Sequence, residues 1–282
     1  MEQRIHIVTD SSCDLPQQLV DEYEITVVPL SVHFGPETYD DGDLSPDEFW
    51  RKAEGPHHPK TSQPPSGLFE TIFERLVEQG KQALCLTVTS KHSGTFGSAY
   101  AAAQRFGDAV ELFDSLSLSL GLGIQALTAA QAARAGSRME EILAALEALR
   151  ERARLTIVLD TLENLRRGGR ADAFIAAVDR MTQVLNIKVI INVIEGQLRL
   201  LGAARSFERA LRRIYRIVEE LGPLEHLAVV HTRRQELAEE LRAKLAATLG
   251  FPEGDIWLRE TGPALASHAG PGVVGVLAIP QG

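Results

Sequence analysis

The sequence predicts an α/β protein of two domains, the first built on a mainly parallel sheet flanked by helices and the second on a mixed or antiparallel sheet with helices. The chain has 282 residues, more than one ordinary hydrophobic core requires. In its first half, short apolar runs alternate with amphipathic stretches, as in parallel βαβ units. In its second half, two β-rich runs flank the turn Glu195–Gln197, which indicates a hairpin.

The first domain starts with the apolar run Ile5–Asp10, predicted to be a buried strand ended by the turn sequence SSCDLP. Helices are predicted where apolar residues recur every three to four positions, and strands where short apolar runs end in turn residues. The predicted elements that follow are a helix opened by Pro16, a β-rich run at 25–34, a helix capped by Ser45, a loop at 55–67, a helix at 68–80, a strand at 83–90, an Ala-rich helix after Ser93, a strand at 109–115 and a helix at 120–136.

A further helix at 138–153 ends where the apolar run Leu155–Asp160 begins a new strand. We place the domain boundary there, near Arg154, which gives domains of residues 1–154 and 155–282. The second domain is then predicted to contain a hairpin within 186–205, a helix at 207–221, a strand at 226–231, a helix at 235–249, a β-like segment at 255–260 and a last strand at 273–280.

Composition narrows the class of protein. Hydrophobic residues make up 44% and charged residues 24% of the chain, which is typical of a globular protein. No apolar run approaches the ~20 residues of a transmembrane helix, and no basic start with an apolar stretch marks a secretory signal. With only Cys13 and Cys85, the chain is expected in the reducing cytoplasm. The net charge of −9 disfavours a nucleic-acid partner, so an anion site would have to be formed locally.

Three loops rich in hydroxyl groups precede predicted helices: Asp10–Asp14, Thr61–Pro64 and Ser93–Thr95. The first backbone amides of a helix lack partners and the helix dipole is positive there, so a carboxylate or phosphate can be bound without a lysine. In parallel sheets such loops gather at the carboxyl ends of the strands. Helix capping is the alternative function of each loop, and for a single loop it is the commoner one.

Catalytic and metal sites fit the residues less well. Ser93 lacks the G-x-S-x-G context of a hydrolase nucleophile, and Asp10 and Asp14 lack the D-x-D spacing of phosphotransfer enzymes. Gly121–Gly123 is only part of a dinucleotide fingerprint, and no Cys or His cluster accompanies the adjacent His57–His58. We therefore predict no metal and no cofactor.

Two later segments combine glycine with basic residues. Leu162–Arg170 places cations around a di-glycine, which is typical of a helix C-terminus but also suits Arg170 as a phosphate or carboxylate contact. Ser267–Gly272 is a glycine-rich turn that carries His268 immediately before a predicted buried strand. A histidine is an unusual choice for a simple turn, so this segment favours a functional role.

The ordered motifs VTDSSCDLP, TSQP, SGTF, FDS with a downstream GLG, LENLRRGGR and HAGPGVVGV resemble the DegV family over essentially the whole chain. The resemblance implies a two-domain α/β protein that is the fatty-acid-binding subunit of bacterial fatty acid kinase. Such a protein is not itself an enzyme. It would hold a long-chain fatty acid such as palmitate between its two domains. It would present the carboxylate to a separate ATP-dependent kinase subunit, giving acyl phosphate for phospholipid metabolism. This role is compatible with transient membrane contact.

The resemblance also assigns residues. Thr61 and Ser93 match the hydroxyls that bind the fatty-acid carboxylate, and Arg170 matches an arginine for kinase docking or phosphoryl transfer. Secondary or lining positions are Ser62, Gly94, Thr95, His268, Asp10 and Ser11. The chain departs from the family pattern at Pro65, where the family usually has serine, and at Lys91–His92, where small or apolar residues are common; the latter pair bears on ligand preference or partner fit.

A lipid ligand is also reasonable energetically. Burial of about fifteen methylene groups contributes ~12 kcal/mol at ~0.8 kcal/mol each. One hydrogen bond to a charged group contributes only ~1.5–3 kcal/mol, so the tail would supply affinity and the hydroxyls orientation. Two other functions stay open: a stand-alone hydrolase or phosphatase using Ser93, His268 or Asp10, and a DNA-binding regulator, which the acidic charge disfavours.

Overall fold

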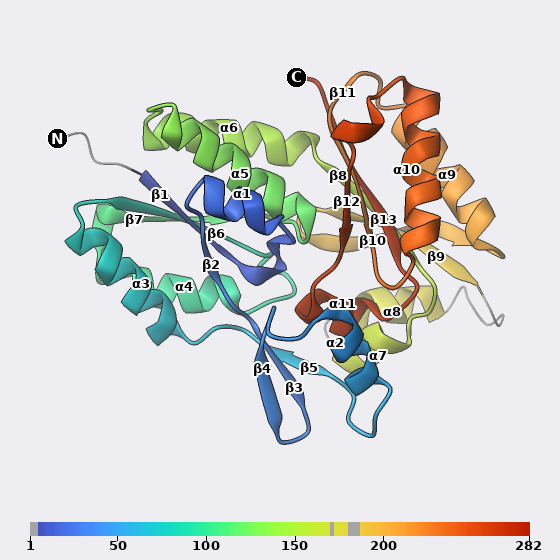
Figure 1. Ribbon diagram of the computed structural model, residues 1–282, viewed down its shortest axis with the longest axis horizontal. Helices are drawn as coiled ribbons and strands as arrows, with labels where there is room; N and C mark the ends of the chain where they lie inside the picture. The colour runs from blue at the N-terminus through green and yellow to red at the C-terminus, as the bar shows by residue number, and fades with distance from the viewer. Residues whose placement is uncertain (1–4, 170–171, 180–186) are drawn as a thin grey trace. The chain divides into compact units, whose positions relative to one another are not determined.

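The computed structural model describes residues 5–169, 172–179 and 187–282 (Figure 1). It divides into two compact units, Met1–Glu151 with Gly262–Ala264 and Arg152–Thr261 with Leu265–Gly282. The first unit has a parallel sheet and the second a mixed sheet, each packed with helices. The predicted fold class is therefore confirmed.

The central sheet of the first unit has four parallel strands in the order β2-β1-β6-β7. Their apolar side chains are mostly buried, as expected for parallel strands covered on both faces. Because the strands are parallel, the loops that follow β1, β6 and β7 all leave the sheet at the carboxyl ends of the strands. The strands are β1 (Ile5–Asp10), β2 (Thr26–Val28), β6 (Gln82–Thr87) and β7 (Val110–Asp114).

Helices cover both faces of this sheet (Figure 1). On one face, Phe69 and Phe73 of α3 (Ser66–Glu78) and the alanines of α4 (Thr95–Ala103) pack on Val8 of β1. On the other lie α1 (Gln17–Glu22), α5 (Leu120–Arg134) and α6 (Met139–Arg152).

A small antiparallel sheet, ordered β4-β3-β5, extends the first unit. Its strands are β3 (Ser31–Phe34), β4 (Glu37–Asp40) and β5 (Lys60–Ser62), and α2 (Pro46–Ala53) starts with a capping box formed by Ser45 and Glu48. The β-rich run predicted at 25–34 contains two strands, β2 and β3, and these belong to different sheets. Pro29 lies between them, and because proline has no N–H it cannot continue a strand ladder.

The second unit is built on a six-stranded sheet, ordered β10-β9-β8-β13-β11-β12. All neighbours are antiparallel except β11 and β12. Glu195 and Gly196, both at positive φ, form the turn of the predicted hairpin. The strands are β8 (Arg154–Leu159), β9 (Lys188–Ile194), β10 (Gln197–Ala204), β11 (Leu224–His231), β12 (Trp257–Glu260) and β13 (Val274–Pro280).

One face of this sheet is covered by α9 (Phe207–Glu219) and α10 (Gln235–Leu249), whose apolar side chains form the main core with Val158, Ile190 and Val276. Three shorter helices, α7 (Glu163–Gly168), α8 (Asp172–Asp179) and α11 (Pro263–Ala269), carry the glycine-rich motifs or lie beside them in sequence. No helix among the described residues has both the length and the apolar character needed to cross a bilayer.

Candidate functional site

The loop after β1 is anchored by the buried carboxylate of Asp10. Its Oδ1 accepts hydrogen bonds from the Ser12 hydroxyl and from the Ser12 amide at 3.1 Å, and its Oδ2 accepts the Val88 amide at 2.7 Å. Burial raises the pKa of Asp10 to about 6, although these hydrogen bonds lower it. Asp10 therefore fixes the loop after β1 to the loop after β6, which contains Ser93.

Two further acids in this region hold a distant segment of chain. Asp14 Oδ1 accepts the Gly262 amide at 2.9 Å, and Asp41 Oδ1 accepts the Ala264 amide at 3.0 Å. Ser11 donates from its hydroxyl to Asp41 Oδ2 at 2.7 Å. Burial raises the pKa of Asp41, while the bonds from Ser11 and Ala264 oppose the rise. Ser11 and both acids are thus engaged in holding the loops together. Sequence reasoning did not single out Asp41, because an acid in an acidic turn resembles any solvated surface group.

Thr61 and Ser62 lie side by side on β5 but face opposite sides of it, because side chains alternate along a strand. Thr61 pairs with Val32 of β3, which is only 1% exposed, and shares its face. The Ser62 hydroxyl lies on the other face, 3.0 Å from His33 Nε2. The structure thus separates Thr61, on the buried side, from Ser62.

Ser93 lies two residues before α4, next to the N-cap residue Gly94. Its Oγ accepts the Thr95 amide at 3.3 Å and lies 2.8 Å from Thr95 Oγ1. Thr95 is fully buried, whereas Ser93 is partly exposed. The hydroxyl of Ser93 is therefore fixed at the start of α4, where the first amides of the helix lack intrahelical partners.

A close contact brings these two hydroxyl-bearing loops together. A Cβ atom added to Gly94 would lie 2.9 Å from the side-chain amide of Gln63, which follows Thr61 and Ser62. Gln63 can occupy this position only because Gly94 has no side chain. The loops at Thr61–Pro64 and Ser93–Thr95 are thus neighbours in the first unit.

The second unit brings its two glycine-rich motifs together in the same way. A Cβ atom on Gly168 would lie 2.6 Å from His268 Nδ1. Asn164 donates from its side-chain amide to the Ser267 carbonyl at 3.3 Å. The end of α7 therefore packs on α11 and His268. Arg170, predicted as the partner contact, lies outside the described residues.

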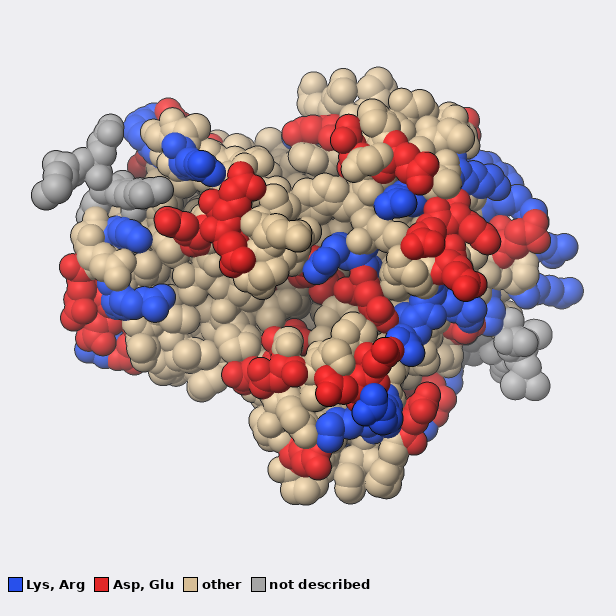
Figure 2. Space-filling view, in the orientation of Figure 1, with Lys and Arg blue, Asp and Glu red and all other residues tan. Residues whose placement is uncertain are grey.

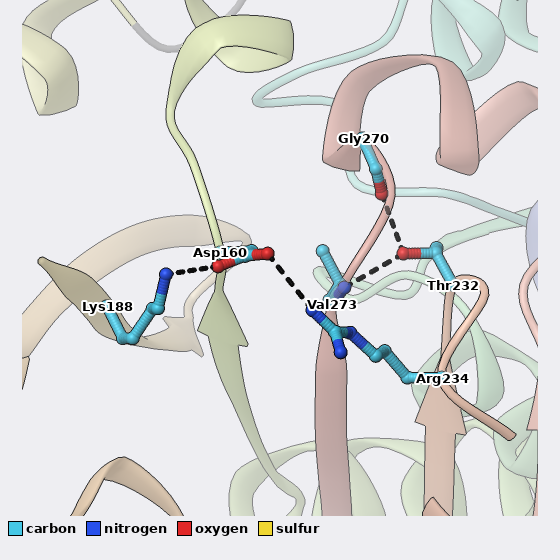
Figure 3. Close-up of polar contacts among 6 residues, drawn as sticks. All are labelled: Asp160, Lys188, Thr232, Arg234, Gly270 and Val273. Carbon is cyan, nitrogen blue, oxygen red and sulfur yellow. Dashed lines mark hydrogen bonds and ion pairs between the residues drawn. The ribbon is translucent and has the colours of Figure 1, made fainter. Parts of the chain in front are cut away.

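The glycine-rich turn after His268 is held by residues from two strand ends, as Figure 3 shows. Thr232 Oγ1 donates to the Gly270 carbonyl at 2.6 Å and accepts the Val273 amide at 2.9 Å. Asp160 lies against Gly272 and is bound by Lys188 and, at 3.3 Å, by Arg234. These contacts, which the sequence did not reveal, fix the backbone around His268.

The chemistry available in the first unit is that of anion binding. Ser93 and Thr61 offer hydroxyls, and α4 offers the amides of its first turn. Both oxygens of Asp10 accept hydrogen bonds from Ser12 and Val88, an arrangement that stabilises a structural carboxylate. Across the part of the chain that the structure describes, no group of three or more His, Cys, Asp or Glu side chains could hold a metal ion.

The partial dinucleotide fingerprint has a different role in the structure. Gly121 and Gly123 lie inside α5. The loop after β1 passes directly over Gly123. A Cβ atom on Gly123 would lie 2.4 Å from the Cys13 carbonyl oxygen. The glycine therefore allows α5 to approach the loop after β1.

Comparisons with known proteins agree with this architecture. The family model described as "uncharacterised protein, DegV family" matches residues 4–281. A DegV domain-containing protein of Deinococcus radiodurans is 34% identical over 282 residues, covering 98% of each chain. One from Caldanaerobacter subterraneus is 31% identical over 280 residues, covering 97% of this chain and 98% of the relative.

Solved structures with the same fold also include DegV family proteins. A DegV family protein from Thermus thermophilus, described as fatty acid binding, superposes with a TM-score of 0.90 at 32% identity, covering 99% of this chain and 100% of that one. DegV from Bacillus subtilis, described as a fatty acid binding protein, gives 0.89 at 28% identity, with 99% and 100% covered. A stearic-acid-binding protein from Eubacterium ventriosum gives 0.85 at 27% identity, with 98% of each chain covered.

Proposed function

The chain belongs to the DegV family, and from this membership we propose that it binds a long-chain fatty acid whose carboxylate is held by the hydroxyls of Thr61 and Ser93. Three relatives between 27% and 32% identical are described as binding fatty acids. The observation that carries the assignment of residues is the packing of Gln63 on Gly94, which makes neighbours of the two hydroxyl-bearing loops.

Hydrogen-bond capacity supports Ser93 in this role. A hydroxyl donates one hydrogen bond and accepts up to two. When Thr95 donates to Ser93 Oγ from both its amide and its hydroxyl, the hydrogen of Ser93 is left for a ligand anion. The positive end of the α4 dipole favours a negative charge at the same place. Thr61 is the second hydroxyl residue of the proposed site, and the acyl tail would supply most of the affinity.

Double replacement of Thr61 and Ser93 by alanine tests the carboxylate site. We expect palmitate to bind at least about tenfold more weakly, since each bond to a charged group contributes ~1.5–3 kcal/mol, while hexadecanol, which has the same tail, changes by less than about threefold. The protein is first denatured and extracted to identify its lipid by mass spectrometry, then delipidated for titration with each ligand.

The matched control is Ser62→Ala, because Ser62 faces the opposite side of β5 and bonds to His33. It should leave palmitate binding within about twofold of the unaltered protein. Equal losses for palmitate and hexadecanol in the double variant would show that these hydroxyls do not recognise the carboxylate. An extract without fatty acid, together with no uptake of palmitate, would contradict the function itself.

Our proposal extends to presentation of the bound carboxylate to a separate ATP-dependent kinase, with Arg170 at the partner contact. The order of motifs from the loop after β1 to the glycine-rich turn at His268 supports it. The groups that contact the Ser93 hydroxyl are the amide and hydroxyl of Thr95, a setting suited to binding and orienting a carboxylate.

Acyl phosphate should form from palmitate and ATP only when this chain and the kinase subunit of the same bacterium are both present. We expect Arg170→Ala to slow formation at least about tenfold and to leave palmitate binding unchanged, because the guanidinium would act on the partner or the transferred phosphoryl group. Trapping the product as a hydroxamate measures the rate. Hydrolysis of acyl esters or acyl phosphate by this chain alone, abolished by Ser93→Ala, would instead establish the hydrolase alternative.

A further inference from the structure

The second unit has a concave site that the proposed fatty-acid function does not use. A cavity of about 560 Å³ lies between β10 and α9, within the size range of small-molecule sites. Its apolar lining is Ile190, Ala203 and Ala204, and its polar lining is four arginines: Arg205, Arg209, Arg213 and Arg216. Figure 2 shows Lys and Arg atoms gathered over the edge of the molecule where Figure 1 places α9.

Three of these arginines are aligned by the helix itself. Arg209, Arg213 and Arg216 follow one another at spacings of four and three residues, which places them on one face of α9. At about 1.5 Å of rise per residue, the row extends over roughly 10 Å. Arg205 adds a fourth cation just before the helix. The row therefore suits an elongated ligand with more than one negative group.

Within the part of the chain that the structure describes, no acidic side chain pairs with these four arginines. Two neighbouring arginines that do not line the cavity are paired with acids, Arg199 with Glu195 at 3.0 Å and Arg212 with Glu208. By contrast, no carboxylate among the described residues forms an ion pair with the four lining arginines. The Arg213 guanidinium donates to a neutral acceptor, the Leu201 carbonyl. This occurs in a chain whose net charge is −9.

Guanidinium groups select the kind of anion. Their planar forks bind phosphate oxygens two at a time, and they are favoured over lysine wherever phosphate is recognised in this geometry. Positive charges three and four residues apart on a helix repel one another, and a bound polyanion removes that repulsion. The volume of about 560 Å³, which is typical of small-molecule sites, favours a small ligand over a bilayer. We propose that this arginine cavity binds a soluble ligand that carries two or more phosphate groups.

The test uses inorganic tripolyphosphate as the probe on the full-length protein, by isothermal titration at constant ionic strength. Arg209→Gln with Arg213→Gln should weaken binding at least about tenfold. Both side chains are exposed, so the variant should fold. The matched control, Arg199→Gln with Arg212→Gln, removes the same charge from the paired arginines and should change binding by less than about twofold. Arg209→Lys with Arg213→Lys keeps the charge without the fork and should give an intermediate loss.

Three results would overturn the proposal: no binding of tripolyphosphate at low salt, equal weakening by both glutamine variants, or binding of single phosphate ions as tight as that of tripolyphosphate. Vesicles of phosphatidylglycerol provide the comparison with a lipid surface. If the vesicles bind through Arg209 and Arg213 and tripolyphosphate does not compete, the surface binds membranes and the proposal is wrong. Palmitate binding should be unchanged in every variant, so the result is independent of the proposed fatty-acid site.

Discussion

Replacement of Asp10 by alanine is expected to lower the free energy of unfolding by about 2–5 kcal/mol at neutral pH. The change leaves the buried amides of Val88 and Ser12 and the Ser12 hydroxyl without their acceptor, and an unsatisfied buried polar group costs about 1–3 kcal/mol. Part of this cost is offset, because the variant no longer buries a charge. Urea unfolding of the two proteins, followed by circular dichroism, measures the difference.

The loss of unfolding free energy in Asp10→Ala should be larger at acidic pH than at neutral pH. Burial raises the pKa of Asp10 from 3.8 to about 6 in the folded protein, so the folded state binds this proton more tightly than the unfolded state does. The corresponding stabilisation is complete below about pH 4 and is lost as the pH rises through about 6. A shift of about two units corresponds to roughly 3 kcal/mol. Asp10→Ala lacks this contribution. The difference in free energy of unfolding between the unaltered protein and the variant should therefore be largest near pH 4 and smaller above pH 6.

Ser12→Ala is the matched control, since it removes one hydrogen-bond donor to Asp10 and keeps the carboxylate. It should destabilise the protein by only about 0.5–1.5 kcal/mol. If Asp10→Ala lowers the free energy of unfolding by the same amount at pH 4.5 and pH 7.5, Asp10 does not titrate in this range. If Asp10→Ala also loses palmitate binding, the contact between Asp10 and the loop after β6 is needed to position Ser93.

The regular parts of the fold could be predicted because their signals are local. The apolar runs of β1, β6 and β13 and the hairpin turn at Glu195 and Gly196 specify strands without knowledge of the rest of the chain. Strand β4 could not be predicted: it is four mostly exposed residues that pair with β3. Strand β5 falls within the loop predicted at 55–67 for the same reason. Such strands exist only because a partner strand supplies their hydrogen bonds.

The same distinction applies to the candidate site. Hydroxyl residues beside helix starts identified the loops at Thr61 and Ser93, because the chemistry of a helix N-terminus is visible in the sequence. The anchors of those loops were not visible. Asp41 binds an amide 223 residues away in the sequence and Asp14 one 248 residues away. Contacts over such separations are set by tertiary packing, which no local pattern reports.

Replacement of Gly123 by alanine is the second large effect that we expect, with a loss of about 1–3 kcal/mol in the free energy of unfolding. Alanine normally favours a helix over glycine by ~1 kcal/mol, so α5 alone would be stabilised. However, the new methyl group would lie 2.4 Å from the Cys13 carbonyl oxygen and 3.1 Å from Leu15 Cγ. A backbone oxygen cannot rotate away as a flexible side chain can, so α5 and the loop after β1 must separate.

Gly97→Ala in α4 provides the opposite case, because no atom outside the local backbone of α4 lies within 4 Å of its added methyl group. This variant should gain about 0.5–1 kcal/mol from helix propensity. Urea unfolding midpoints of the two variants should therefore move in opposite directions from that of the unaltered protein. The separation caused by Gly123→Ala should also strain the bond from Ser119, at the start of α5, to Asp14. If Gly123→Ala is as stable as Gly97→Ala, α5 does not press on this loop, and the glycine has no packing role there.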